Sequence, residues 1–299
     1  MLINEVRQNA NLTKKAIEYY TEQELVSPAV LENGYRDFSL KDVEQLKKIS
    51  LFRKLGLSVQ DIKAILADET GDTLQKIAVQ KEMAVQRAQA KRTALDKLCR
   101  GHSDLTAELE AIELNATITE KLLELFPGYY GRFVCLHFAR FLNEPIATEE
   151  ERHAYSDITT FLDNVPSLVF PDDVQTFLDE NTKDYSPDAI STLLESVKHS
   201  IENPETYLTE NSKEVIEQYY EFRQSDAYKD SPISKMQAIL KEFNRSSGYY
   251  DVFIPAMKIL SKPYTEYCHQ MKVANEILLS QYPEIMQLIP NKQNAQSGI

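Results

Sequence analysis

Residues 12–20 have the sequence LTKKAIEYY and open the part of the chain that decides its fold. Thr13 is a residue type that caps helix N-termini, so a helix is predicted to begin there and to run to about Glu24. Ile17 and Tyr20 are spaced to lie on the inward face of this helix. The stretch therefore predicts a short amphipathic helix that begins with two lysines.

Residues 33–38 have the sequence NGYRDF, which predicts a β-hairpin. Asn33-Gly34 suits the positive φ angles of a tight hairpin turn, and the aromatic residues that follow suit a pleated strand. We therefore expect a small wing here. The chain has only eight glycines and is rich in Leu, Glu, Lys, Gln and Ala, so few other strands are expected.

Two further helices are predicted after the hairpin. Ser39 is expected to cap a helix that runs through Leu55 and ends at Gly56, and Ser58 to cap another that runs to Ala67. Short helices around one hairpin are typical of a winged helix-turn-helix. The apolar positions that recur at helical spacing in the two helices are Val43, Leu46, Ile49, Leu51, Phe52, Ile62, Ile65 and Leu66.

The order and spacing of these stretches resemble the signature of the MerR family of transcriptional regulators. The resemblance covers residues 1–67 and includes residues 3–6 (INEV), 12–20, 25–28 (LVSP), 33–38, 39–43 (SLKDV), 55–56 (LG) and 58–63 (SVQDIK). It implies a homodimer that binds double-stranded promoter DNA. It also implies that an effector makes the dimer bend and untwist a promoter whose spacer between the RNA polymerase contact elements is too long.

Six residues are expected to bind DNA, namely Thr13, Lys14, Lys15, Tyr19, Tyr35 and Arg36. The first three place a hydroxyl, exposed amides and two cations at a helix N-terminus. Such a group can bind a DNA phosphate while the helix lies in the major groove. The phenol of Tyr19 can hydrogen-bond to the DNA backbone, and the two wing residues can contact a flanking phosphate or the minor groove. Outside this signature, such charges would be ordinary solvated surface residues.

Three residues depart from the family pattern. Asn11 stands where the family commonly has Gly before the recognition helix, and Asn tolerates the left-handed conformation. Glu18 stands where the family commonly has an Arg that contacts DNA, so that contact is not expected here. Because a carboxylate repels phosphates, Glu18 either points away from the DNA or lowers the affinity for non-cognate DNA. Glu24 replaces a helix-ending Gly, at a cost of about 1 kcal/mol if its φ is positive.

Residues 71–125 are expected to form a dimerisation helix and a linker helix. A heptad pattern with mostly apolar seam positions begins at Leu74 and favours pairing with a second copy, antiparallel by the family resemblance. A helix packed only on its own domain is the alternative. Residues 101–103 (GHS) are expected to break the helix, with Ser103 starting a second helix toward Phe126. The seam candidates are Leu74, Ile77, Ala84, Ala88, Leu95 and Leu98.

The expected domains are a DNA-binding head at residues 1–70, the dimerisation and linker helices, and an all-helical effector-binding domain at residues 126–299. Prolines punctuate the last part where helices are expected to start or end. The polar residues 291–299 are expected to be disordered. The fold class is thus mainly α, with a small β-hairpin, a long dimerisation helix and an all-α C-terminal domain.

Charge is divided unevenly along the chain. The net charge is -13, but residues 1–67 are close to neutral and the acidic excess lies beyond them. This division fits a small DNA-reading head on a larger body with another task. No apolar run approaches the 18 or so residues that span a bilayer, so no membrane partner is expected and a cytoplasmic location is predicted.

Neither a cofactor nor a metal site is expected. Cys99, Cys135 and Cys268 are far apart in sequence, and each is predicted to be a buried structural residue. The metal-sensing members of the family need cysteines at both ends of the dimer helix, and this chain lacks that set. No catalytic constellation is found, and His137, in the apolar run 133–138, is predicted to be a hydrogen-bonded core histidine.

Pairs of aromatic residues recur in the C-terminal part. They suit a pocket for a small ligand that is hydrophobic or cationic. They equally suit the core and rim of a helical domain, and the sequence favours neither. Two functions stay open: a ligand-responsive switch, or a constitutive repressor whose C-terminal domain docks a partner protein. The ligand-binding candidates are Tyr129, Tyr130, Tyr219, Tyr220, Tyr249 and Tyr250.

Overall fold

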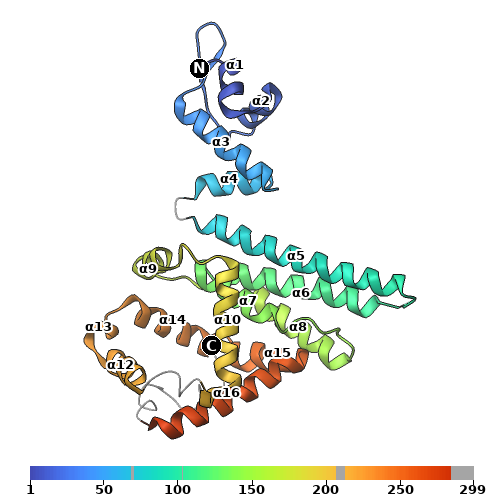
Figure 1. Ribbon diagram of the computed structural model, residues 1–299, viewed down its shortest axis with the longest axis vertical. Helices are drawn as coiled ribbons and strands as arrows, with labels where there is room; N and C mark the ends of the chain where they lie inside the picture. Colours follow the sequence, from blue (N-terminus) through green and yellow to red (C-terminus); the bar gives the residue numbers. More distant parts are fainter. Residues whose placement is uncertain (69–70, 103, 207–212, 284–299) are drawn as a thin grey trace. The chain divides into compact units, whose positions relative to one another are not determined.

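The computed structural model describes residues 1–68, 71–102, 104–206 and 213–283 and consists of helices with one two-stranded antiparallel sheet (Figure 1). This confirms the predicted fold class. The chain divides into two compact units, the first covering Met1–Leu74 and the second beginning at Gln75. Ser103 and residues 291–299, whose conformations were predicted above, lie outside the described residues.

The first unit is the helix-turn-helix head. Its elements are α1 (Ile3–Ala10), α2 (Lys14–Glu22), β1 (Ala29–Val30), β2 (Arg36–Asp37), α3 (Leu40–Lys54) and α4 (Val59–Ala67). Thr13 caps α2, as predicted, because its Oγ1 accepts a hydrogen bond of 3.1 Å from the Ala16 amide. Ser39 and Ser58 cap α3 and α4 in the same way. The core of the head includes Val6, Ile17, Phe38, Leu46, Ile49 and Ile62.

Two backbone positions carry the left-handed conformations that the sequence suggested. Asn11, after α1, has a φ of 51°, and Glu24, after α2, has a φ of 58°. Because Glu24 leaves the helical region, α2 ends at Glu22, two residues earlier than predicted. Of the apolar positions noted at helical spacing on α3, Leu51 does not join the core: its side chain is 57% exposed, because it lies about 200° around α3 from the buried Ile49.

The second unit is all helical in its described residues. Its elements are α5 (Asp72–Cys99), which begins three residues before the boundary, α6 (Thr106–Leu125), α7 (Gly128–Ala139), α8 (Glu149–Asn164), α9 (Asp172–Thr182), α10 (Pro187–Glu202), α12 (Lys213–Gln224), α13 (Asp226–Lys229), α14 (Pro232–Ser246), the π-helix η1 (Tyr249–Phe253), α15 (Ile254–Leu260) and α16 (Lys262–Gln281). Pro187, Pro232 and Pro263 lie in the first turns of α10, α14 and α16, as predicted.

The core of the second unit joins segments that are far apart in sequence. α6 packs on α7 and α8, and α15 packs on α8, η1 and α16. Phe253 of η1 is fully buried, and its ring lies 5.0 Å from that of Phe138 on α7 and 5.5 Å from that of Phe161 on α8. Three elements therefore meet at one aromatic side chain.

The turn between α6 and α7 requires a glycine. Gly131 lies in the first turn of α7 and its amide donates a hydrogen bond to the Pro127 carbonyl. A Cβ at this position would lie 2.1 Å from the carbonyl oxygen of Phe126, which is far inside van der Waals contact. The helix boundary that residues 126–128 predicted is confirmed, and the close approach explains why no side chain fits.

α5 and α6 form a hairpin, which appears as two adjacent helices in Figure 1. Gly101 has a φ of 93° and ends the first helix, as predicted. Ion pairs link the two helices along their length: Arg87 with Glu120 at 3.3 Å, Lys91 with Glu113 at 2.5 Å and Lys97 with Glu108 at 2.9 Å. The hairpin is therefore fastened at several levels.

Candidate nucleic-acid interface

The N-terminus of α2 presents the first group of predicted DNA-binding residues. Lys14 and Lys15 occupy its first two positions, and both side chains are exposed. Amides in the first turn of a helix lack intrahelical acceptors, and the helix dipole adds positive potential there. Thr13 satisfies one of these amides. The end of α2 is thus suited to an anion such as a phosphate.

Glu18 lies one helical turn after Lys14. Its Oε1 is 3.6 Å from the Lys14 Nζ, an exposed pair of little energetic value. The pair places the carboxylate beside Lys14, where it offsets part of the charge of that lysine. Lys15 makes no ion pair with any residue that the structure describes. Lys15 is therefore the cation in this turn whose charge remains uncompensated.

The hairpin presents the second group. β1 and β2 pair in the register Ala29 to Asp37 and Val30 to Arg36. Tyr35, immediately before β2, is 65% exposed, and Arg36, the first residue of β2, is half-buried. On α2, Tyr19 is 45% exposed, and its ring lies 5.8 Å from that of the buried Tyr20. The six candidates thus lie on α2 with its cap and on the hairpin, and each is exposed or half-buried.

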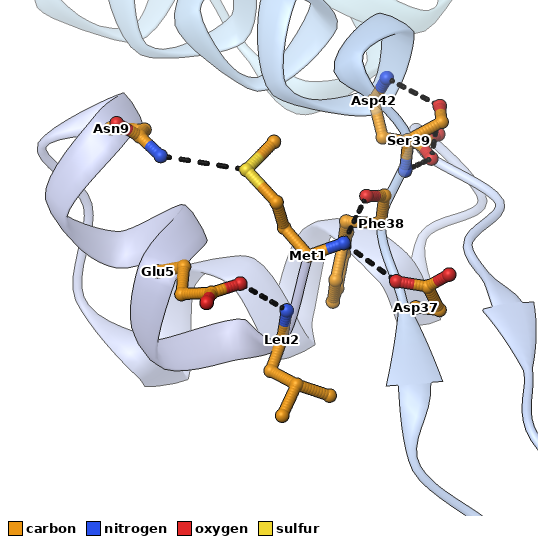
Figure 2. A network of polar contacts seen from close by, with 8 residues as sticks. All are labelled: Met1, Leu2, Glu5, Asn9, Asp37, Phe38, Ser39 and Asp42. Atoms are coloured by element: carbon orange, nitrogen blue, oxygen red, sulfur yellow. Dashed lines mark hydrogen bonds and ion pairs between the residues drawn. The ribbon is translucent and has the colours of Figure 1, made fainter.

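A polar network that the sequence did not suggest holds the base of the hairpin (Figure 2). The amino group of Met1 lies 2.6 Å from the Asp37 carboxylate and donates a hydrogen bond to the Phe38 carbonyl, while the Phe38 amide donates to the Met1 carbonyl. Ser39 and Asp42 close the adjoining capping box. The network connects Met1, two residues before α1, to the end of the wing strand, although no local sequence pattern links them.

Most seam candidates on α5 are exposed to solvent within the single chain. Leu95 is 58% exposed and Leu98 45% exposed, whereas Ile77 is only 7% exposed and so packs within its own chain. Leu74 is also exposed, as are Ala84 and Ala88. A row of apolar side chains in solvent at heptad spacing is the expected appearance of a dimer helix without its partner.

The cysteines are only partly as predicted. Cys135 and Cys268 are buried, but Cys99 is exposed because it lies at the end of α5, where the helix gives way to the Gly101 turn. Burial raises the pKa of the Cys135 thiol to about 12. Within the described ranges no three His, Cys, Asp or Glu side chains are grouped closely enough to hold a metal ion.

The candidate tyrosines do not form one group. Tyr249 is buried in the core of the second unit, where its ring lies 5.4 Å from that of Tyr250. Tyr130 lies near that cluster, and burial raises its pKa. Tyr129 instead contacts the ring of Tyr185, at 5.6 Å.

The remaining pair lies on another helix. Tyr219, on α12, is 54% exposed, with the Arg223 guanidinium 5.9 Å from its ring, and Tyr220 is half-buried. The spacing of the tyrosines along the chain therefore did not indicate a shared site.

His137 is a core histidine, as predicted. It is 3% exposed, and its Nδ1 accepts a hydrogen bond of 3.2 Å from the Arg140 guanidinium. Burial, helped by the charge of Arg140, lowers its pKa to about 3. His137 therefore stays neutral in the folded protein under conditions where an exposed histidine is protonated.

This lowered pKa predicts acid sensitivity. Below pH 6.5 His137 is protonated in the unfolded chain but stays neutral in the folded chain. The free energy of unfolding therefore falls between pH 6.5 and pH 3. From pH 7 to pH 5 the expected loss is about 2 kcal/mol. Urea unfolding should show it, and His137→Gln should flatten the profile from pH 6.5 to 5. The other four histidines are exposed, so an equally steep profile in the variant would contradict this assignment.

Comparison with known proteins identifies the head. The family described as MerR HTH family regulatory protein matches residues 1–69. The transcriptional regulator CueR of Yersinia pestis is 37% identical over 68 residues, which is 22% of this chain and 49% of that protein. The regulator HmrR of Rhizobium leguminosarum bv. viciae is 31% identical over 115 residues, which is 37% of this chain and 81% of that protein.

A third relative matches a quarter of the chain. The multidrug-efflux transporter 2 regulator of Bacillus subtilis is 32% identical over 75 residues, which is 25% of this chain and 28% of that protein. The chain thus spans about half the length of the first relative and about a quarter of the third. No solved structure matches the chain.

The head and its relatives define a helix-turn-helix regulator of transcription. Because the chain covers four-fifths of HmrR at 31% identity, it belongs to the MerR family of transcriptional regulators. Members of this family typically bind DNA. No helix among the described residues is both long and apolar enough to cross a membrane.

Proposed function

We propose that the protein is a cytoplasmic regulator that binds promoter DNA as a homodimer and changes transcription by distorting that DNA in response to an effector. The observation that carries the proposal is the exposed end of α2, where Lys15 has no ion-pair partner among the described residues. A cation beside unsatisfied helix amides is suited to a DNA phosphate.

Binding of an effector can supply enough free energy to distort the DNA. Bending a site of 20 to 30 base pairs costs roughly 1 to 6 kcal/mol, which a ligand can provide through a difference in affinity for two dimer conformations. α5 runs from Asp72 to Cys99 without an internal Pro or Gly, so it is suited to move as a rigid element. The RNA polymerase would then engage the realigned promoter elements.

Lys15→Ala and Arg36→Ala are each expected to reduce the salt dependence of DNA binding. Each loss of one phosphate contact lowers the slope of log K against log salt by about 0.9, or about 1.8 for the two copies in a dimer. The measurement is fluorescence anisotropy with the duplex upstream of the protein's own gene. Lys272→Ala removes the same charge from α16 and serves as the control. If both head variants keep the wild-type affinity and salt slope, Lys15 and Arg36 do not contact the DNA.

Footprinting on the same duplex tests the mechanism. Protection should be pseudo-palindromic and centred on the spacer between the polymerase contact elements, with hypersensitive cleavage at its centre in one ligand state. Protection elsewhere, with no hypersensitive centre in any state, would favour a steric repressor whose C-terminal domain docks another protein.

A further inference from the structure

A cavity of about 290 Å³ lies between α5, α6 and α7, within the second unit. Its floor is apolar and well buried: Leu123 is 4% exposed and Cys135 1% exposed, and Met83 contributes from α5. The raised pKa of Cys135 keeps its thiol neutral, so the thiol acts as part of the apolar floor. None of the candidate tyrosines lines this cavity.

The rim of the cavity is polar and has an acidic excess. Arg87 lines it, but its guanidinium already pairs with the Glu120 carboxylate at 3.3 Å. Glu124, the second rim carboxylate, has no ion-pair or hydrogen-bond partner among the residues that the structure describes. An apolar floor beneath a few polar groups is the usual composition of a small-molecule site, and the volume lies near the lower limit for such sites.

The cavity lies behind the exposed row of apolar residues on α5. Met83 lines the cavity, whereas Ala88 lies five residues later, about 140° around the helix, on the exposed row. One helix thus carries the cavity wall on one face and the seam on another. A ligand in the cavity would contact the helix that we propose to pair with the second copy.

We propose that this cavity binds a small molecule with an apolar ring body and a single positive charge, the body resting on Leu123 and Cys135 and the charge near Glu124. The uncompensated carboxylate favours a cation, and the chain's net charge of -13 disfavours an anion. Binding stands independently of DNA recognition; the use of this ligand as the effector rests on the proposed function.

The probe for the test is 1-naphthylmethylammonium, with 2-naphthoate as its anionic counterpart. The chain contains no tryptophan, so naphthalene fluorescence can be followed on the full-length protein. The expected result, in the absence of DNA, is saturable binding of one ammonium probe per chain, with the carboxylate probe at least tenfold weaker. Glu124→Gln should weaken binding of the ammonium probe about tenfold, since it removes a charge-assisted contact.

Two further variants make the result specific to the cavity. Ala139→Leu fills the space from α7 and should abolish binding while the circular dichroism and melting temperature show that the fold persists. Glu214→Gln removes an exposed carboxylate from α12 and should leave affinity unchanged. Equal binding of the two probes, or undiminished binding to both cavity variants, would overturn the proposal. Because DNA is absent, either outcome leaves the test of DNA recognition untouched.

Discussion

Replacing both Leu95 and Leu98 by lysine is expected to convert the protein from a dimer to a monomer in sedimentation velocity. Both side chains are about half-exposed in the single chain, so the substitution removes little from its own core. In an antiparallel pair it would bring four ammonium groups into an apolar seam. Each leucine removed would also cost the dimer about 1.5 to 3 kcal/mol of free energy from side-chain burial. DNA affinity should fall with the dimer, because one head contacts only half of a palindromic site.

The control for the seam is Val169→Lys. Val169 is 76% exposed in the loop between α8 and α9, so it offers the same change from apolar to cationic away from α5. This variant should sediment like the wild type. A seam variant that remains dimeric would place the dimer interface elsewhere.

Phe253→Ala is expected to lower the free energy of unfolding of the second unit by about 3 to 5 kcal/mol, the usual cost of truncating a buried aromatic side chain. Phe253 is fully buried, and its ring stacks on that of Tyr249 at 5.3 Å besides contacting those of Phe138 and Phe161. The truncation leaves a cavity where η1, α7 and α8 meet. Chemical denaturation of the full chain, followed by tyrosine circular dichroism, measures the loss.

Phe222→Ala makes the same chemical change on α12, where the side chain is 47% exposed. Its ring contacts only that of Tyr228 among the described rings, so a loss of about 1 kcal/mol or less is expected. If the two variants were equally destabilised, the aromatic junction around Phe253 would not be the centre of the core.

Local signals account for the parts of the fold that could be predicted from the sequence. A helix cap such as Thr13 depends on residues within one turn, and the turn at Gly34, with a φ of 80°, depends on a single residue's freedom. The same holds for the break at Gly101 and the boundary at residues 126–128. These elements appear where the sequence predicts them, to within a few residues.

Features that depend on distant packing could not be predicted. Whether Leu51 or Ile77 is buried depends on which elements cover each face of the helix, and helical spacing alone does not say. The tyrosine pairs looked alike in sequence but lie in different surroundings. The cavity on α5 was missed because its wall combines residues from three helices and from the segment after α7, none of them unusual in its own segment.

The ion pairs between α5 and α6 should affect how easily the hairpin bends. Two helices that are prevented from sliding past each other resist bending more than either helix does alone. Arg87, Lys91 and Lys97 supply such shear connections at successive levels. High salt weakens exposed ion pairs of this kind. The α5–α6 hairpin should therefore bend more easily as ionic strength rises, even while each helix stays fully folded.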